Sequence, residues 1–267
     1  MAASSACDPP DEHADSPDAV HGKPNMILAV DAGNTRLKWA LHDGRHFVRD
    51  DSVPLSGLGR LGESWQSLEA PGRIVVSNVA GKPVQQQLQA LFDRWKAAAT
   101  WVVGRREQCG VRSRYDDPGQ LGPDRWAALI GAQRQAAGAC LVVNAGTAMT
   151  VDALTGDGEF LGGLIVPGFD LMHQALESNT ARLSAERGAF AAFPRNSRDA
   201  ITSGAIDALC GAVERMRARM VAHTGGEPEI ILGGGAGDIL AEHLGRPARR
   251  VERLVLEGLV CIAGEPA

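Results

Sequence analysis

Two stretches of this chain share one residue pattern 113 positions apart, and this repeat restricts the fold more than any other feature. Each stretch begins with an apolar run that predicts a buried strand, breaks at a short turn of small and polar residues, and resumes as a second strand. The first unit covers residues 26–41 and the second covers residues 140–154. Two strand-turn-strand units far apart in one chain indicate a duplicated domain, with chance identity in a sequence rich in alanine and glycine as the alternative. The identical pairs are Val30 and Val143, Ala32 and Ala145, Gly33 and Gly146, Ala40 and Ala153, and Leu41 and Leu154.

The first turn has the composition of an anion-binding loop. Asp31 ends the buried strand, where an acidic side chain costs free energy unless it has a partner. Gly33 permits unusual backbone angles, and the N–H groups of Gly33, Asn34 and Thr35 could form a concavity for an anion. The Asp31 carboxylate suits Mg²⁺. The alternative is an Asx-type hairpin turn. If both turns of the repeat face one cleft, they could hold one polyphosphate between them.

A second candidate site lies just before the second unit. Pro123 follows Gly122 and is placed as prolines are at the first position of a helix, which we expect to continue to about Gln135. Asp124 and Arg125 therefore lie in the first turn. An acid there is favourable with the helix dipole and requires no chemistry, and the dipole should make Asp124 a poor base. Arg125 is unfavourable at this end of a helix, and an anion partner would explain it.

Alternating strands and helices along the remaining chain predict an α/β fold. A glycine-rich run, residues 233–237, follows the last expected strand; such loops often contact nucleotides but are also common elsewhere. We expect three parts: a disordered extension at 1–25, a first lobe at 26–120 and a second lobe at 121–267. The expected strands and helices outside the repeat cover residues 61–68, 73–79, 82–96, 101–103, 160–166, 169–176, 199–223 and 229–232.

Composition excludes several classes of function. The chain has 267 residues and a net charge of −5, with acidic and basic residues interspersed, so no basic face indicates nucleic-acid binding. Its five cysteines are scattered and lack metal-ligand spacing, which is typical of a reducing compartment. No apolar run approaches the roughly 20 residues that a membrane-spanning helix needs. We therefore expect a cytoplasmic protein without nucleic-acid or membrane partners.

The sequence resembles the type III pantothenate kinase family, within the superfamily of actin, heat-shock chaperones and hexokinase. The resemblance covers essentially residues 26–262, and it depends on several motifs in the same order rather than on any one alone. The motifs are Asp31-Ala32-Gly33-Asn34-Thr35-Arg36, Tyr115 with Gly122-Pro123-Asp124-Arg125, Ala145-Gly146-Thr147-Ala148, Gly162-Gly163-Leu164-Ile165-Val166-Pro167-Gly168, Asn179-Thr180-Ala181-Arg182-Leu183 and Gly233-Gly234-Gly235. The resemblance implies ATP-dependent phosphorylation of pantothenate, two ribonuclease-H-like lobes with a nucleotide cleft between them, a homodimer, Mg²⁺ and a monovalent cation (K⁺ or NH₄⁺).

The resemblance also implies a role for each matching residue. Asp124 would accept the proton of the pantothenate hydroxyl, and Asp31 would lie near Mg²⁺ and hold it through water. The glycine-rich run would border the adenosine. ATP would be bound by Asp31, Ala32, Gly33, Asn34, Thr35, Arg36, Leu37, Lys38, Gly146 and Thr147. The pantothenate pocket would be lined by Tyr115, Gly122, Pro123, Asp124, Arg125 and Thr180.

One departure from the family pattern concerns the monovalent cation. Asn144 stands where the family usually has Asp, so this position supplies a carbonyl oxygen but no charge. Asp152 could partly compensate. Two other functions fit the same fold: a non-catalytic relative with a regulatory role, and a kinase of the same superfamily that acts on a sugar. Retention of Asp31, Asp124, Arg125 and Thr147 argues against the first, whereas Asn144 argues mildly for it. Tyr115 together with residues 122–125 favours pantothenate over a sugar.

Overall fold

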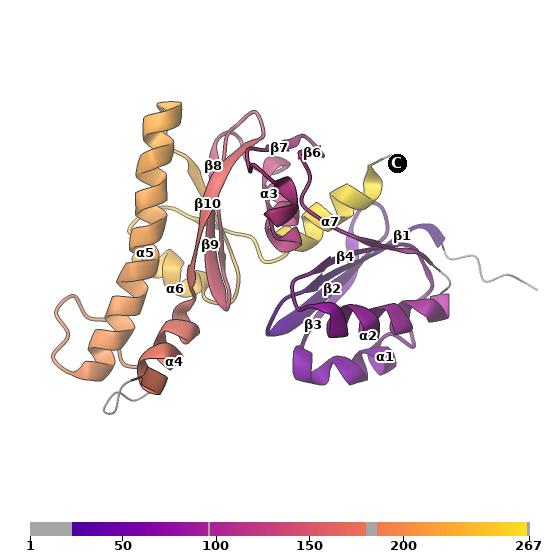
Figure 1. The fold of residues 1–267 in the computed structure, drawn as a ribbon, viewed down its shortest axis with the longest axis horizontal. Helices are drawn as coiled ribbons and strands as arrows, with labels where there is room; N and C mark the ends of the chain where they lie inside the picture. The colour runs from indigo at the N-terminus through magenta and orange to yellow at the C-terminus, as the bar shows by residue number, and fades with distance from the viewer. Residues whose placement is uncertain (1–22, 96, 180–185, 266–267) are drawn as a thin grey trace, which may run out of the picture.

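The computed structural model describes residues 23–95, 97–179 and 186–265, which form two β-sheets with helices on their faces (Figure 1). The first sheet has the strand order β3-β2-β1-β4-β5, and the second has the order β12-β11-β8-β9-β10-β7-β6. The strands of the first sheet are β1 (Lys23–Ala32), β2 (Arg36–His42), β3 (Phe47–Pro54), β4 (Pro71–Asn78) and β5 (Ala99–Trp101). Those of the second are β6 (Glu107–Gln108), β7 (Val111–Ser113), β8 (Cys140–Ala145), β9 (Ala148–Leu154), β10 (Glu159–Pro167), β11 (Glu229–Gly233) and β12 (Arg249–Arg250).

The two sheets share one topology. In each, three consecutive strands form antiparallel hairpins, and the next two strands add in parallel on the other side of the first. Thus β1 to β5 correspond to β8 to β12, while β6 and β7 extend the second sheet beyond β10. The duplication read from the sequence is therefore confirmed at the level of the fold, as is the α/β class.

The helices make three apolar layers with the sheets (Figure 1). One core, which includes Leu37, Trp39 and Trp65, lies on the face of the first sheet covered by α1 and α2. A second lies between the second sheet and α5. The third contains α3 and α7 residues and joins the lobes. The helices are α1 (Leu61–Ser64), α2 (Lys82–Phe92), α3 (Pro123–Gln133), α4 (Phe169–Asn179), α5 (Ser197–Thr224), α6 (Gly237–His243) and α7 (Leu254–Gly264).

The contact between α3 and α7 depends on glycine. Helix α3 comes after β7 and helix α7 comes after β12, and the two pack together between the lobes. A Cβ atom on Gly131 would overlap the backbone oxygen of Leu254, and one on Gly258 would overlap that of Ala127. The helix backbones therefore approach more closely than any larger residue would permit.

Some element boundaries differ from our expectation. Residues 55–60 form a 3₁₀ helix and α1 covers only residues 61–64, because Gly57, Gly59 and Gly62 disfavour a longer helix. The short strand expected at 101–103 lies at Ala99–Trp101. β1 begins at Lys23, so its first three residues fall within the segment that we expected to be disordered. Residues 1–22 lie outside the described residues, and the proposed division into lobes at residue 120 stays a prediction.

Candidate active site between the lobes

The two turns of the repeat meet. The Oγ1 atoms of Thr35 and Thr147 are 2.7 Å apart and share a hydrogen bond, although the residues belong to different lobes. Each turn follows the first strand of its sheet, β1 or β8, which pairs in parallel with a neighbour. Ligands of open α/β sheets bind beyond the carboxyl ends of such strands. The site is therefore the region where the carboxyl ends of two sheets face each other.

Some residues of the first turn are buried in the core of the first lobe, and others are exposed. Asn34, Thr35 and Arg36 are exposed, whereas Ala32 and Leu37 are completely buried and anchor the turn in the first lobe. The Arg36 guanidinium donates to the hydroxyl and the backbone oxygen of Ser52 on β3. The N–H of Gly33 donates to the Arg36 oxygen (3.1 Å), so it is not free for the anion-binding concavity that we expected. The Thr35 hydroxyl is the group of this turn that contacts the second lobe.

The second turn is enclosed by backbone from two other segments. The N–H of Gly168 donates to the Thr147 oxygen (2.8 Å), and the N–H of Ala236 donates to the Ala145 oxygen (3.0 Å). Gly234 has a φ of +85°, and a Cβ there would overlap the backbone of Ala145. The glycine-rich run therefore lies directly against the turn. The sequence suggested nucleotide contact for that run, but it gave no sign that Gly168 would also support the turn.

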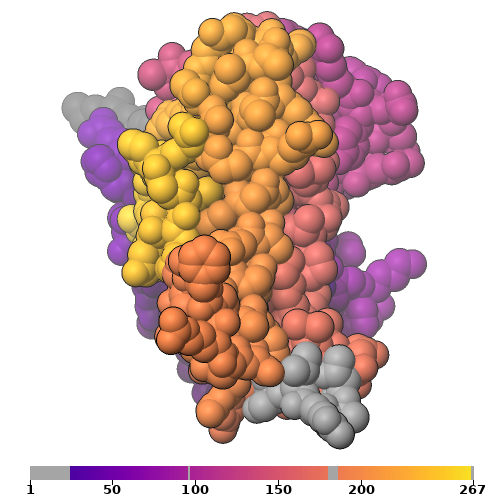
Figure 2. Space-filling view, turned by 90° about the vertical axis from the view of Figure 1, so that its left-hand side faces the viewer, coloured from indigo at the N-terminus to yellow at the C-terminus, as the bar shows by residue number. Residues whose placement is uncertain are grey.

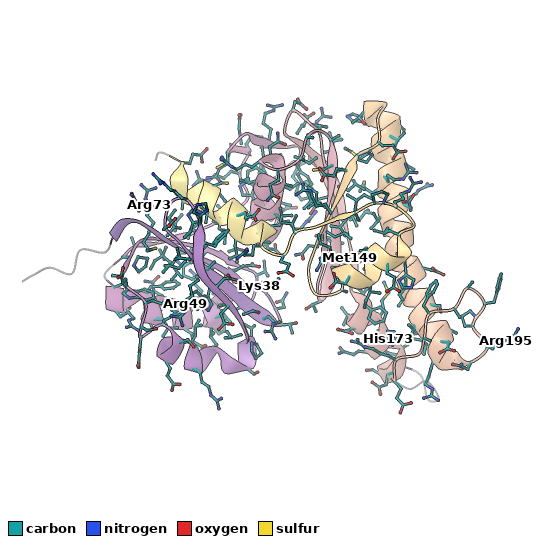
Figure 3. All side chains as sticks on the ribbon, turned by 180° about the vertical axis from the view of Figure 1, so that it is seen from behind. Lys38, Arg49, Arg73, Met149, His173 and Arg195 are labelled. Atoms are coloured by element: carbon teal, nitrogen blue, oxygen red, sulfur yellow. The ribbon has the colours of Figure 1, made fainter. Side chains whose placement is uncertain are left out.

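Asp31 has an environment suited to a cation. Its Oδ1 is buried and has no hydrogen-bond partner among the described residues. It lies opposite Lys38 in the β1–β2 register, and Lys38 lies on the side of the first lobe that faces the second lobe (Figure 3). Burial, together with the charge of Asp124, raises the pKa of Asp31 to about 7, against the opposing charge of Lys38. A buried carboxylate oxygen without a donor fits a hard divalent ion such as Mg²⁺.

Asp124 lies in the first turn of α3, as the sequence predicted. Its Oδ1 accepts the backbone N–H of Arg125 (2.8 Å). Burial nevertheless raises the pKa of Asp124 above its usual value. Our expectation that the helix dipole would make it a weak base is wrong, because desolvation disfavours the charged form more than the dipole and hydrogen bond favour it.

Arg125 has its anion partner within the protein. Its side chain is 6% exposed, and it forms a two-point ion pair with Asp152 on β9, which is 1% exposed. Its remaining terminal nitrogen donates to the Tyr115 hydroxyl (3.2 Å). The expectation that Asp152 compensates for the missing charge at Asn144 is therefore wrong, since its carboxylate is already neutralised by Arg125. Sequence reasoning did not find this pair, because nothing local relates residues 125 and 152.

The other predicted pocket residues lie around α3. Gly122 precedes the helix and Pro123 begins it; a Cβ on Gly122 would lie 2.7 Å from Oδ1 of Asp124. Asn144 is the last residue but one of β8, where it lies opposite Gly233 and is half-buried. Thr180 lies outside the described residues.

Within the part of the chain that the structure covers, no helix has the length and apolar character to cross a bilayer.

Comparison with known proteins identifies close relatives. The sequence model of the family described as type III pantothenate kinase matches residues 27–219. A type III pantothenate kinase from Nitrosospira multiformis is 47% identical over 240 residues, which cover 90% of this chain and 92% of that protein. One from Aromatoleum aromaticum is 46% identical and covers 91% and 99%.

Solved structures share the fold at low sequence identity. A Campylobacter jejuni protein assigned to the Baf family of transcriptional activators superposes with a TM-score of 0.58 at 20% identity, covering 88% of this chain and 96% of that one. The ethanolamine utilization protein EutJ from Carboxydothermus hydrogenoformans superposes with a TM-score of 0.54 at 12% identity, covering 90% of both chains. At these identities, the structures support the architecture alone.

Proposed function

The chain belongs to the type III pantothenate kinase family, and from that premise we propose how its two lobes transfer a phosphoryl group from ATP to pantothenate. The enzyme is an ATP-dependent kinase that catalyses the first step of coenzyme A biosynthesis, forming 4′-phosphopantothenate. The observation that carries the proposal is the hydrogen bond between Thr35 and Thr147, because it brings the two repeated turns within reach of one phosphate chain.

The first turn, residues 31–38, and the second turn, at Gly146 and Thr147, bind the triphosphate of ATP in this proposal. The two threonine hydroxyls and the backbone N–H groups of Asn34 and Thr35 supply donors, and Lys38 supplies a positive charge near Asp31. Asp31 would hold Mg²⁺ through water. When bound, Mg²⁺ neutralises charge on the phosphates and polarises them.

Asp124 is the group we assign to the substrate hydroxyl. Phosphoryl transfer passes through a loose transition state that needs mainly positioning and charge stabilisation. The Arg125 N–H fixes one oxygen of the Asp124 carboxylate, which leaves the other oxygen to orient the alcohol and accept its proton. The raised pKa of Asp124 makes it a better proton acceptor than an ordinary carboxylate.

We assign the pantothenate pocket to Tyr115, Gly122, Pro123, Arg125 and Thr180. Arg125 is neutralised by Asp152, so it acts in this pocket through its directed N–H groups more than through free charge. The Tyr115 hydroxyl, which receives one of those N–H groups, is the nearest polar group on the neighbouring loop.

A monovalent cation, K⁺ or NH₄⁺, is the finer part of the cofactor proposal. Asn144 would hold it through its amide oxygen, and Asp152 contributes no free charge because it pairs with Arg125. We therefore expect a weak dependence on K⁺ or NH₄⁺. Turnover in K⁺, NH₄⁺ and choline salts at equal ionic strength measures this dependence, and Asn144→Asp should strengthen it. Wild-type turnover that requires K⁺ absolutely would contradict the proposal.

A homodimer in the cytoplasm is the assembly and location that we propose. The second lobe has an apolar groove between α4 and α5, lined by Pro167, Met172 and Ala205 among others. Helix α5 (orange) forms much of the face that points away from the first lobe (Figures 1 and 2). Light scattering should give twice the chain mass. Met172→Glu should give the single-chain mass, while Val48→Glu, an exposed residue of the first sheet, should not.

The test of the function is an assay of purified protein with ATP and Mg²⁺. We expect ADP to form with pantothenate and not with a panel of sugars, because a polar pocket built for one substrate discriminates strongly against another. ADP formation with a sugar alone would support the sugar-kinase alternative. Absence of ADP with every substrate would support a regulatory protein.

A further inference from the structure

We propose that Asp152 is a positioning residue for the pantothenate pocket, which holds the Arg125 guanidinium so that it orders Tyr115 beside the α3 turn that carries Asp124. The inference rests on the proposed function, because it concerns the same site. Asp152 lies on β9 of the second sheet, and its side chain is shielded from solvent and from the cleft. It therefore acts through Arg125 and not by touching the substrate.

Two contacts with the Asp152 carboxylate fix the orientation of the Arg125 guanidinium. Nε of Arg125 donates to Oδ2 of Asp152 at 3.0 Å, and Nη2 contacts Oδ1. Two parallel hydrogen bonds fix both the distance and the plane of the guanidinium, which one bond would leave free to rotate. Because both side chains are almost fully buried, water offers neither group an alternative partner.

The neighbouring strand leaves room for the pair. Gly163 of β10 lies opposite Asp152 in the strand register. A Cβ atom at Gly163 would overlap Oδ1 of Asp152 and would lie 2.7 Å from Nη2 of Arg125. A side chain at this position is therefore incompatible with the observed pair, so glycine here has a direct structural reason.

The fixed guanidinium of Arg125 contacts Tyr115 in the proposed pantothenate pocket. Its Nη1 donates to the Tyr115 hydroxyl at 3.2 Å, and its guanidinium carbon lies 5.8 Å from the centre of the Tyr115 ring. Its backbone N–H donates to the Asp124 carboxylate. One arginine thus connects β9, the loop at residue 115 and the first turn of α3, which belong to three separate parts of the chain.

A purely stabilising role would not require this arrangement. A buried ion pair is weak evidence for stability, because apolar residues of similar volume often replace such pairs without loss. A directed donor that faces the Tyr115 hydroxyl has no apolar equivalent. The geometry therefore points to orientation of the substrate pocket as the role of Asp152.

The test compares Asp152→Asn with wild-type enzyme in steady-state kinetics. Asparagine keeps the size of the side chain and removes its charge, so Arg125 loses its fixed position. We expect the KM for pantothenate to rise at least about 10-fold while the KM for ATP stays within about twofold, since displacement of a pocket by less than 1 Å is sufficient for such losses. Asp157→Asn removes a carboxylate from an exposed ion pair with Arg112 and serves as the control with unchanged kinetics.

A second variant keeps both charges. Gly163→Ala displaces the pair by contact alone and should also raise the pantothenate KM selectively, so it carries the test if Asp152→Asn does not fold. A pantothenate KM within twofold of wild type, or equal rises in both KM values with a lowered melting temperature, would overturn the inference. Wild-type protein that forms no ADP with pantothenate would instead defeat the proposed function.

Discussion

At the scale of single residues, the site depends on two buried carboxylates, Asp31 and Asp124. The charge of Asp124 raises the pKa of Asp31, and burial raises the pKa of both. Asp31 and Asp124 nevertheless have different roles in the proposed mechanism. Asp31 has an oxygen without a donor, which suits a cation, whereas Asp124 has one oxygen fixed by a backbone N–H and the other available to the substrate. Separate substitutions should therefore have separate consequences.

Asp124→Asn should lower turnover without preventing ATP binding. The amide oxygen can still accept the Arg125 N–H, so the turn keeps its shape, but the group no longer accepts a proton. We expect kcat to fall by about 10²-fold or more, the usual scale for loss of a general base. Affinity for Mg²⁺ and a non-hydrolysable ATP analogue, measured by calorimetry, should stay within about threefold. Asp116→Asn, on the nearby exposed loop, is the control; near-normal turnover in Asp124→Asn would reduce Asp124 to a structural role.

Asp31→Asn should change how stability depends on pH. The pKa of Asp31 is about 7 in the folded chain and 3.8 without burial, so the folded state holds the proton over this range while the unfolded state has lost it. Stability from this group therefore falls as pH rises from about 4 to 7. The variant lacks this loss and should exceed wild type by roughly 1–4 kcal/mol above pH 7, with little difference near pH 4.

Urea unfolding at several pH values between 4 and 8, without nucleotide or Mg²⁺, measures this difference. Asp124 and Asp152 also have a raised pKa and contribute to the wild-type slope in the same direction, so the comparison uses the difference between variant and wild type. Asp207→Asn, on the exposed side of α5, should show a constant difference. A constant difference for Asp31→Asn as well would mean that burial does not hold the Asp31 proton.

At the scale of secondary structure, the contact between α3 and α7 is the element most sensitive to side-chain size. Gly258→Ala would place a methyl group against the Ala127 oxygen, so the helices must separate. We expect a loss of about 1–3 kcal/mol in the free energy of unfolding, the usual range for overpacking. Gly211→Ala in α5 has open space around the new methyl and should be neutral or stabilising by up to about 1 kcal/mol. Equal effects in urea unfolding would show that the helices adjust without cost.

Periodicity predicted most elements because it reflects local burial. The second strand of the first repeat unit corresponds to β2, and the start of α3 followed from Gly122 and Pro123. The helix expected at residues 61–68 is shorter in the structure, where α1 ends at Ser64. The packing of α3 on α7 was not predicted, since no local signal relates Gly131 to Gly258.

For the candidate site as well, the sequence predicted which residues take part but not the contacts that depend on tertiary packing. The motifs identified which residues to examine, and the repeat predicted that the two turns would face each other, which the Thr35–Thr147 hydrogen bond bears out. The sequence could not predict the ion-pair partner of Arg125 or the raised pKa of Asp124. Both follow from three-dimensional burial, which places a β9 carboxylate against a helix 27 residues earlier and removes water from the first turn of α3.

At the scale of the whole molecule, the duplication gives each lobe one half of a phosphate site. The equivalence of β1–β5 with β8–β12 means that each lobe offers its turn at the same end of its sheet. The hydrogen bond between the Thr35 and Thr147 hydroxyls joins these ends, while α3 and α7 join the lobes elsewhere. A nucleotide held by both turns would therefore couple the lobes, and its binding energy should depend on both turns together.

Thr35→Val and Thr147→Val test this coupling in a double-mutant cycle. Each change keeps the side-chain shape and removes one hydroxyl. Each should weaken binding of Mg²⁺ and an ATP analogue by about 10- to 150-fold, since a hydrogen bond to a charged group contributes roughly 1.5–3 kcal/mol. The two hydroxyls contact each other, so removal of one disturbs the other and the double variant should lose less than the sum. Thr100→Val, exposed on β5, is the control. Losses that add within about 0.5 kcal/mol in calorimetry would mean that the two hydroxyls act independently, which would contradict the expected coupling between the turns.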